Sequence, residues 1–488
     1  MRSVYVLTDG RHLFQFSEVK VRCSALIAGI VVGVISHLMA TPFGLFFNDQ
    51  TLRVDYFRTG TAEQEIISID ALRTEGQWPG SRTQLVDRLD RGNHRVQIVH
   101  KDDSRILFSQ GYNTIFQEWQ STEPARQGIF RTFHESVRTP MPNQPVVLRF
   151  ESRNRFGQFE TVAETTIDPQ AKNINREVRP PLAPVCSFVQ NGLPSEKVDL
   201  VFLGDGYRPE EMEKYHRDTE RAIASLFQNE PFKSRAKDFN VWVVDVCSVD
   251  AGIDEPCRSL WRSTALGTSY NALDSPRYIL TIDNCAVRDF AAAAPYDAIA
   301  ILVNSPRYGG GGIFNQFAIS FTGNAPGEPD WWCDYVFVHE FGHSFAGLAD
   351  EYYSSQISYL DYYPENTEPW EPNITAVLDT NNIKWAGLMD PATPVPTPWD
   401  KCRYDSLSAL VQRLDAGHVD YKNGIAEMQA ILRNPDVAGK IGCFEGAGYA
   451  SRGLFRPAID CRMFSKSMAP FCSVCQQAIE QVIDSQSR

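Results

Sequence analysis

The chain has 488 residues, of which 43% are hydrophobic and 22% charged, and it carries a formal net charge of −13. This composition is typical of a globular protein with a large core, and the length favours two folded domains after an N-terminal segment. The acidic balance argues against nucleic acid or an anionic membrane surface as a partner, because both bind basic patches.

The first predicted element is a signal peptide or N-terminal membrane anchor within residues 1–47. Residues 25–40 form an uncharged apolar run that follows Lys20 and Arg22, and a basic flank before an apolar stretch is typical of an export signal. Extending the run to Phe47 makes it long enough to span a bilayer, so a tether through 25–47 stays open beside a cleaved signal. Both alternatives predict a protein that is secreted, periplasmic or held at the cell surface.

Short strands with polar turns follow, and they predict a β-sandwich domain over residues 48–167. Leu52, Val54 and Tyr56, for example, alternate as on a half-buried strand. Residues 168–185 contain four prolines among polar residues, a composition typical of a linker between domains.

The remaining segment, 186–488, begins with alternating strand and helix patterns. Apolar runs predict strands at Val198–Leu203, Val241–Val246 and Ala298–Val303, and an amphipathic stretch predicts a helix over 210–227. Strand, helix and strand in this order indicate an α/β domain.

A run of four glycines at 309–312 precedes a predicted strand over Ile313–Phe321. No lysine follows the glycines at phosphate-loop spacing, which excludes that interpretation. Further along, residues 354–442 are rich in proline and tryptophan, and we interpret them as an insertion that walls a cleft.

The cysteines are concentrated in this second domain. Of eleven, ten lie between Cys186 and Cys475, and an even number in an exported domain predicts disulfides, without revealing their pairing. Cys472 and Cys475 have the spacing of half a structural zinc site, but no second such pair exists. Disulfide partners among Cys443, Cys461, Cys472 and Cys475 are therefore the preferred interpretation.

The pentapeptide His339-Glu340-Phe341-Gly342-His343 is the most informative motif. On a helix, the two histidines lie one turn apart and can both bind one metal ion, with Glu340 beside them as a base. This pattern predicts a zinc peptidase site, in which Glu340 activates a zinc-bound water. The apolar residues around it recur at spacings of three and four, as on the buried face of a helix: Val338, Phe341, Phe345 and Leu348.

Catalytic zinc usually has three protein ligands and one open position. Gly347 can end the helix in a left-handed turn, after which Asp350 and Glu351 follow. A chain that reverses here can return a carboxylate to the metal, so Asp350 is the predicted third ligand and Glu351 the reserve.

At this point the sequence resembles the immunoglobulin A peptidase family of zinc metallopeptidases, peptidase family M64. The resemblance rests first on the run His339 to Tyr353, HEFGHSFAGLADEYY. Further blocks that look like the family, in the same order, lie on both sides of this run: 198–207, 264–267, 304–315, 445–449 and 456–475.

The resemblance implies an α/β (α+β) zincin fold of the metzincin type, with a methionine turn beneath the metal, preceded by the N-terminal β domain. Met463 is the predicted turn methionine and Met389 its rival. One departure concerns spacing, because Gly347 and Asp350 come four and seven residues after His343, one more than metzincins have.

The resemblance also implies that an edge strand before the active-site helix binds substrate, which assigns this role to 313–321. A tyrosine could assist the reaction, and Tyr449 and Tyr352 are the candidates. The predicted function is an exported zinc endopeptidase that hydrolyses peptide bonds of extracellular proteins. The alternative is a non-catalytic adhesion or glycan-binding protein on a zincin scaffold, against which the intact histidines and Glu340 argue.

Overall fold

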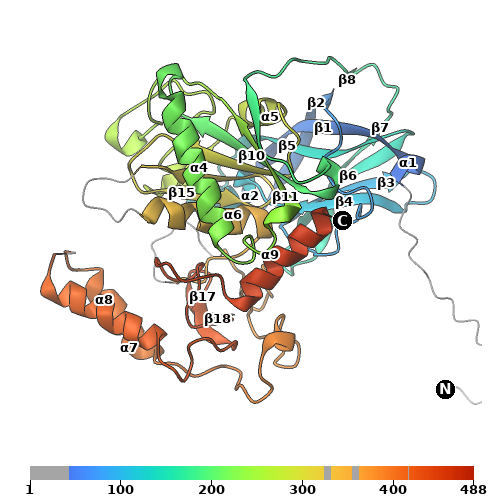
Figure 1. The fold of residues 1–488 in the computed structure, drawn as a ribbon. Helices are drawn as coiled ribbons and strands as arrows, with labels where there is room; N and C mark the ends of the chain where they lie inside the picture. Colours follow the sequence, from blue (N-terminus) through green and yellow to red (C-terminus); the bar gives the residue numbers. More distant parts are fainter. Residues whose placement is uncertain (1–42, 324–330, 354–361, 416, 488) are drawn as a thin grey trace, which may run out of the picture. The chain divides into compact units, whose positions relative to one another are not determined.

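The computed structural model describes residues 43–323, 331–353, 362–415 and 417–487, which belong to one compact unit (Figure 1). The apolar run at 25–40 lies outside the described residues. Within them, no helix is both long and apolar enough to cross a bilayer. The described chain is a mixed α/β structure with several sheets.

The N-terminal region contains two four-stranded sheets, with strand orders β5-β1-β2-β8 and β4-β3-β6-β7. The strands of the first sheet are β1 (Phe47–Gly60), β2 (Glu65–Thr74), β5 (Arg131–Pro142) and β8 (Ile174–Asn175). Those of the second are β3 (His94–His100), β4 (Ile106–Tyr112), β6 (Val146–Arg153) and β7 (Phe159–Ile167). Three short helices accompany them, namely α1 (Phe43–Phe46), α2 (Ile115–Gln120) and α3 (Glu123–Arg126).

One hydrophobic core joins these two sheets. Leu52 and Tyr56 of β1 are fully buried and belong to the same cluster as Ile98 of β3 and Leu148 of β6. The alternation of apolar side chains along each strand turns one face of each sheet towards this common core. The segment predicted as a linker contributes β8, which pairs with β2 in parallel.

A six-stranded mixed sheet forms the centre of the second region, with the order β15-β16-β14-β10-β11-β9. Its strands are β9 (Val185–Val189), β10 (Val198–Asp205), β11 (Phe239–Val244), β14 (Ala298–Val303), β15 (Gly310–Ile313) and β16 (Phe317–Phe321). The strands predicted near 198, 241 and 298 are confirmed. All eight residues of β10 are buried, as expected for a parallel strand covered on both faces.

The prediction of one continuous edge strand over 313–321 is wrong. β16 lies inside the sheet, between β14 and β15, and the edge is formed by β15 from the glycine run. The glycines allow this strand to lie directly against the neighbouring helix, because a Cβ at Gly312 would overlap the Glu340 carbonyl oxygen. A sequence pattern of apolar alternation could not reveal this close approach.

The helices of this region are α4 (Met212–Gln228), α5 (Asn284–Ala291), α6 (Trp332–Ala346), α7 (Lys401–Val411), α8 (Val419–Leu432) and α9 (Ser473–Gln486). Two small hairpins complete it, β12 (Thr268–Ser269) with β13 (Leu280–Thr281) and β17 (Phe444–Ala447) with β18 (Ala450–Arg456). Helix α6 packs against β15, β16, α4 and α9, which places it in the middle of the region.

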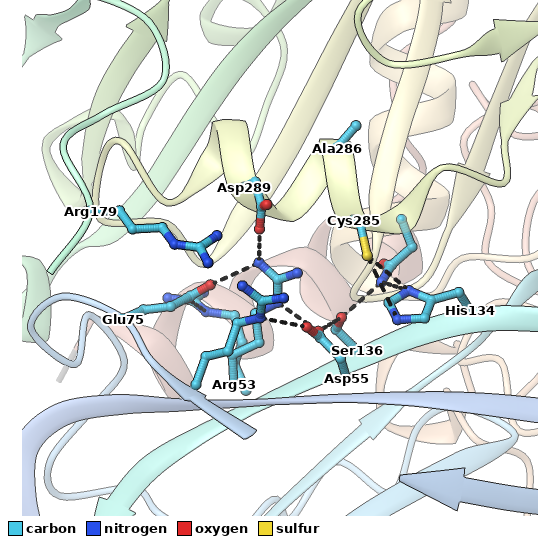
Figure 2. Close-up of polar contacts among 12 residues, drawn as sticks. Arg53, Asp55, Glu75, His134, Ser136, Arg179, Cys285, Ala286 and Asp289 are labelled. Atoms are coloured by element: carbon cyan, nitrogen blue, oxygen red, sulfur yellow. Dashed lines mark hydrogen bonds and ion pairs between the residues drawn. The ribbon is translucent and has the colours of Figure 1, made fainter. Parts of the chain in front are cut away.

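A partly buried polar cluster connects the N-terminal sheet to α5 (Figure 2). Arg53 on β1 binds Asp289 on α5 at 2.5 Å and Asp55 at 2.6 Å. Beside this pair, Asn284 on α5 donates a hydrogen bond to Ser136 on β5 at 2.8 Å. Because buried charges are costly without partners, these contacts favour one arrangement of the two regions over others.

A second connection reaches the end of α6. Arg91 from the N-terminal region is 3% exposed and donates hydrogen bonds to the carbonyls of Ala346 in α6, at 3.0 Å, and Ala478 in α9, at 2.9 Å. A guanidinium at the C-terminal end of a helix pairs with its unsatisfied carbonyls and with the negative end of its dipole. The N-terminal region thus supports the helix that carries the two motif histidines.

Candidate active site

Helix α6 carries the pentapeptide as the sequence predicted. Val338, Phe341 and Phe345 on this helix are almost fully buried, and so is Leu348 just beyond it. The helix ends at Gly347, which has the left-handed conformation, with φ of 63°. Because this conformation is strained for residues with a Cβ, glycine is well suited to turn the chain back towards the histidines.

Three potential metal ligands meet at this turn. The Nε2 atoms of His339 and His343 are 3.1 Å apart, and Asp350 Oδ1 lies 3.1 Å from the first and 3.2 Å from the second. Donors at about 2.0–2.1 Å from one tetrahedral zinc ion would be about 3.3 Å apart. The spacing of the three atoms therefore fits a single divalent cation.

The hydrogen bonds of the other ring nitrogens, the Nδ1 atoms, indicate which nitrogen of each histidine can bind a metal. His339 Nδ1 faces the carbonyl oxygen of Arg462 at 3.1 Å, and His343 Nδ1 faces that of Leu348 at 2.6 Å. A carbonyl only accepts, so both Nδ1 atoms carry a proton, which leaves the two Nε2 atoms as the nitrogens that can bind a metal ion. Asp350 Oδ1 is also buried and has no hydrogen-bond partner among the described residues. These three atoms facing one point form a donor set that suits a metal cation.

The electrostatics of Asp350 also favour a cation at this point. Desolvation raises the pKa of Asp350, but the two imidazoles outweigh it and hold the pKa well below its usual range. Burial lowers the pKa of His343, but the carboxylate of Asp350 reverses the effect and raises it to about 9. Asp350 is therefore an anion that attracts positive charge to the histidine pair.

The reserve ligand, Glu351, does not face the histidines. It is fully buried and lies instead beside Cys461, Cys472 and Cys475. Consecutive residues of an extended segment point to opposite sides, so Asp350 and Glu351 cannot both reach the same centre. The extra residue between His343 and the acid is accommodated by the turn at Gly347.

Glu340 lies in the cleft next to the two histidines. It is half-buried, and its side chain lies so close to Gly310 that a Cβ there would be 2.9 Å from its Cγ. Burial raises the pKa of Glu340, although the neighbouring histidines oppose the shift. A carboxylate with a raised pKa is suited to accept and return a proton near neutral pH.

The tyrosines named from the sequence both lie at the site. The Tyr449 hydroxyl donates a hydrogen bond to Asp350 Oδ2, the oxygen that does not face the histidines. Tyr352 stacks on the ring of His339, with 6.4 Å between centroids, and its own ring meets that of Tyr449 edge-on. Tyr449 therefore contacts the candidate metal centre through Asp350.

Met463 lies beneath α6. It is fully buried, and its sulfur lies 3.3 Å from the position of a Cβ on Gly342, between the two histidines. Its carbonyl accepts the backbone N–H of Glu351 at 2.9 Å. Met389, the rival, packs in a separate cluster with Ile383 and Trp385.

Two further residues line the site: Arg277, which no motif indicated, and Tyr308, which lies in the family-like block 304–315 but had no predicted role. Both line a cleft of about 480 Å³ that also contains the histidines, Glu340 and Asp350. Desolvation lowers the pKa of Arg277, but the surrounding phenols and carboxylates outweigh it and raise the pKa. Burial raises the pKa of Tyr308 to about 12. Arg277 lies in an irregular loop without a recognisable motif, so only the fold could place it here.

The N-terminal region also contributes to this cleft. Asn113 and Glu118 line it, and Glu118 accepts a hydrogen bond from Tyr278 at 2.8 Å. The cleft is therefore formed by both regions of the chain. The predicted insertion contributes as well, through Trp370 and Glu371.

The disulfide prediction is not met. All ten cysteines among the described residues are free, and the sulfurs of Cys461 and Cys475 are 3.7 Å apart. A disulfide requires about 2.05 Å. Four of the ten are exposed, at 186, 247, 257 and 402.

Comparison with known protein families identifies a class of peptidase. A sequence profile described as IgA Peptidase M64 matches residues 187–483, and one described as Peptidase M64 N-terminus matches residues 42–163. The chain belongs to the IgA peptidase M64 family, as its motifs predicted. No curated protein matches the chain.

Proposed function

We propose that the chain is an exported, zinc-dependent endopeptidase. The observation that carries the proposal is the convergence of His339, His343 and Asp350 on one point, with Glu340 beside them in the cleft. Three protein ligands, a neighbouring carboxylate and room for a substrate are the components of a metallopeptidase site.

The proposed metal is zinc, held by the Nε2 atoms of both histidines and by Asp350 Oδ1. When bound, zinc supplies a Lewis acid that lowers the pKa of a coordinated water and polarises a carbonyl. Glu340 takes a proton from the attacking water and passes it to the leaving amine. Tyr449 keeps Asp350 oriented through its hydrogen bond.

Arg277 and Tyr308 are proposed to face the negative charge that develops on the substrate carbonyl. A guanidinium remains charged throughout the working pH range and donates several hydrogen bonds, so it suits an oxyanion. Tyr308 can donate as well, because its raised pKa keeps the phenol protonated.

The substrate is proposed to be an extended peptide that runs along β15. Gly312 and Ile313 line the cleft at this sheet edge, whereas Gly310 is already bonded to Arg277 and Ile279, and the carbonyl of Phe314 accepts the backbone N–H of Asn113. Backbone pairing with the free part of an edge strand aligns a peptide without demanding one sequence.

The proposed fold class of the catalytic region is a zincin of the metzincin type. The mixed sheet with an antiparallel edge strand, the helix α6 and Met463 beneath it support a metzincin-type zincin. Two sheets that share one core support a β-sandwich at 48–167, followed by a linker at 168–185 and a catalytic domain at 186–488. Export through the segment 1–47 rests on its basic and apolar sequence.

A mixed peptide library tests this function. Purified protein is incubated with the library, and new peptide termini are identified by mass spectrometry. We expect internal cleavage that a zinc chelator abolishes and added Zn²⁺ restores. A protein that binds metal at the histidines but cleaves no peptide would instead support the non-catalytic alternative.

A further inference from the structure

A second group of metal-ligating side chains lies next to the first. Glu351, Cys461, Cys472 and Cys475 each offer one ligand atom, and these atoms all lie within 4.8 Å of one another. They come from three segments, namely the turn after α6, the turn that contains Met463, and the start of α9. Glu351, Cys461 and Cys475 are buried and Cys472 is half-buried.

The separations of these atoms fit a tetrahedral metal site better than a disulfide. Two thiolates bound to zinc at about 2.3 Å lie about 3.8 Å apart, and the sulfurs of Cys461 and Cys475 are 3.7 Å apart. Cys475 Sγ lies 3.3 Å from Glu351 Oε1. A thiolate and a carboxylate oxygen on one tetrahedral ion would be about 3.5 Å apart.

The surroundings also suit ligands rather than free thiols. The backbone N–H of Cys472 donates to Cys461 Sγ at 3.3 Å, and the Asn373 amide donates to Glu351 Oε1 at 3.0 Å. Hydrogen bonds of this kind orient metal ligands and stabilise their negative charge. Asn373 is itself fixed by two hydrogen bonds to the backbone of Ala349.

Glu351 supplies an independent indication of a cation. Its side chain is fully buried, and Oε2 has no hydrogen-bond partner among the described residues. Burial raises the pKa of Glu351 well above its usual range, which shows how costly the anion is here without a bound cation. The nearby guanidinium of Arg456 opposes this shift, but it donates to the backbone carbonyls of Gly446 and Ile459. A buried carboxylate beside three cysteines is costly unless a metal balances their charge.

We propose that Cys461, Cys472, Cys475 and Glu351 hold a structural zinc ion, distinct from the histidine centre. Four protein ligands leave no open position, so this centre stabilises the fold and performs no chemistry. It would join the segment that carries Asp350 to the turn that carries Met463, whose carbonyl already binds the Glu351 N–H. The proposed zinc would thereby fix the position of Asp350 at the neighbouring site.

Cobalt substitution of the full chain tests this proposal. Co²⁺ bound to thiolates gives an intense sulfur-to-metal absorption in the near ultraviolet, which a site of two histidines and an aspartate cannot give. We expect two metal ions per chain and this absorption in the wild type. His343→Ala should lose one metal ion and keep the absorption, whereas Cys475→Ser should lose one metal ion together with the absorption.

Two further variants complete the design. Cys443→Ser replaces a buried cysteine outside the cluster, and it should retain both metal ions and the absorption. If Cys475→Ser does not fold, Glu351→Gln provides the test. It keeps all three sulfurs and should weaken metal binding at the cysteine site. The proposal is overturned if the cobalt-loaded wild type lacks the thiolate absorption, or if mass spectrometry finds a disulfide between Cys461 and Cys475. Thiolate absorption without peptide cleavage would contradict only the proposed peptidase function.

Discussion

Asp350 and Glu351 are neighbours in the chain, but their carboxylates face two different clusters. Asp350 Oδ1 lies 3.1 Å from His339 Nε2, and Glu351 Oε1 lies 3.3 Å from Cys475 Sγ. The segment that follows α6, up to Tyr353, thus connects the candidate catalytic centre to a second group of ligands. Its conformation determines whether the third ligand reaches the histidines.

Paired substitutions at these neighbours distinguish their roles. Asp350→Asn should weaken metal binding at the histidine centre by more than about 100-fold, since losing only an outer partner of a ligand costs 10–100-fold. Glu351→Gln should leave the affinity of that centre nearly unchanged. Competition with a chelator of known affinity, followed for each variant, measures the difference. Equal effects of the two substitutions would contradict the assignment of Asp350.

Tyr449→Phe removes the hydroxyl that donates to Asp350 Oδ2. We expect peptide cleavage to fall by about 10- to 100-fold, together with a smaller loss of metal affinity, because the carboxylate loses its orienting partner. Steady-state kinetics and metal titration check the two effects. Tyr421→Phe, a change on α8 away from the cleft lining, is the control and should behave as the wild type.

Gly312→Ala tests the close approach of β15 to α6. The new Cβ would overlap the Glu340 carbonyl oxygen and lie 2.9 Å from the Cβ of His343, so the backbone would have to move. Overpacking of this kind costs about 1–3 kcal/mol, and we expect lower stability together with lower activity. Gly387→Ala is the matched control, because nothing lies within 4 Å of its Cβ position. Equal unfolding midpoints for the two variants would contradict the packing.

Glu371 in the cleft wall gives a pH-dependent prediction. It is 3% exposed, and desolvation raises its pKa to about 7. The folded state therefore favours the protonated acid, so this stability contribution is complete below the usual pKa of about 4.5 and is lost as the pH rises through 7.

Glu371→Gln should remove that dependence. Relative to the wild type, the variant should gain up to about 3 kcal/mol of unfolding free energy between pH 4.5 and pH 8, the free-energy equivalent of the shift. Chemical denaturation at several pH values measures the gain. If the unfolding free energies of the two proteins change with pH in parallel, Glu371 does not cause this pH dependence.

The parts of the site that could be predicted from the sequence are those that depend on local spacing. Helix α6, its buried face and the turn at Gly347 follow from periodicity and from glycine chemistry. The preference for Asp350 over Glu351 agrees with the geometry because the turn brings only one of two adjacent side chains to the histidines.

The remaining parts depend on contacts between distant segments. Cys461 and Cys475 meet Glu351 more than a hundred residues away, so spacing within the sequence suggested disulfides instead of a four-ligand cluster. The edge position of β15 depends on which strands pair, and Arg91 reaches α6 from another region of the chain. No local pattern contains this information.

The rate of peptide cleavage by Glu340→Gln, compared with wild type at equal metal content, tests the central claim most directly. Glutamine keeps the shape of the side chain but cannot accept the proton. The account predicts unchanged metal binding and a loss in kcat of about 100- to 10,000-fold. Undiminished cleavage by the metal-loaded variant would contradict the role of Glu340 and, with it, the proposed mechanism.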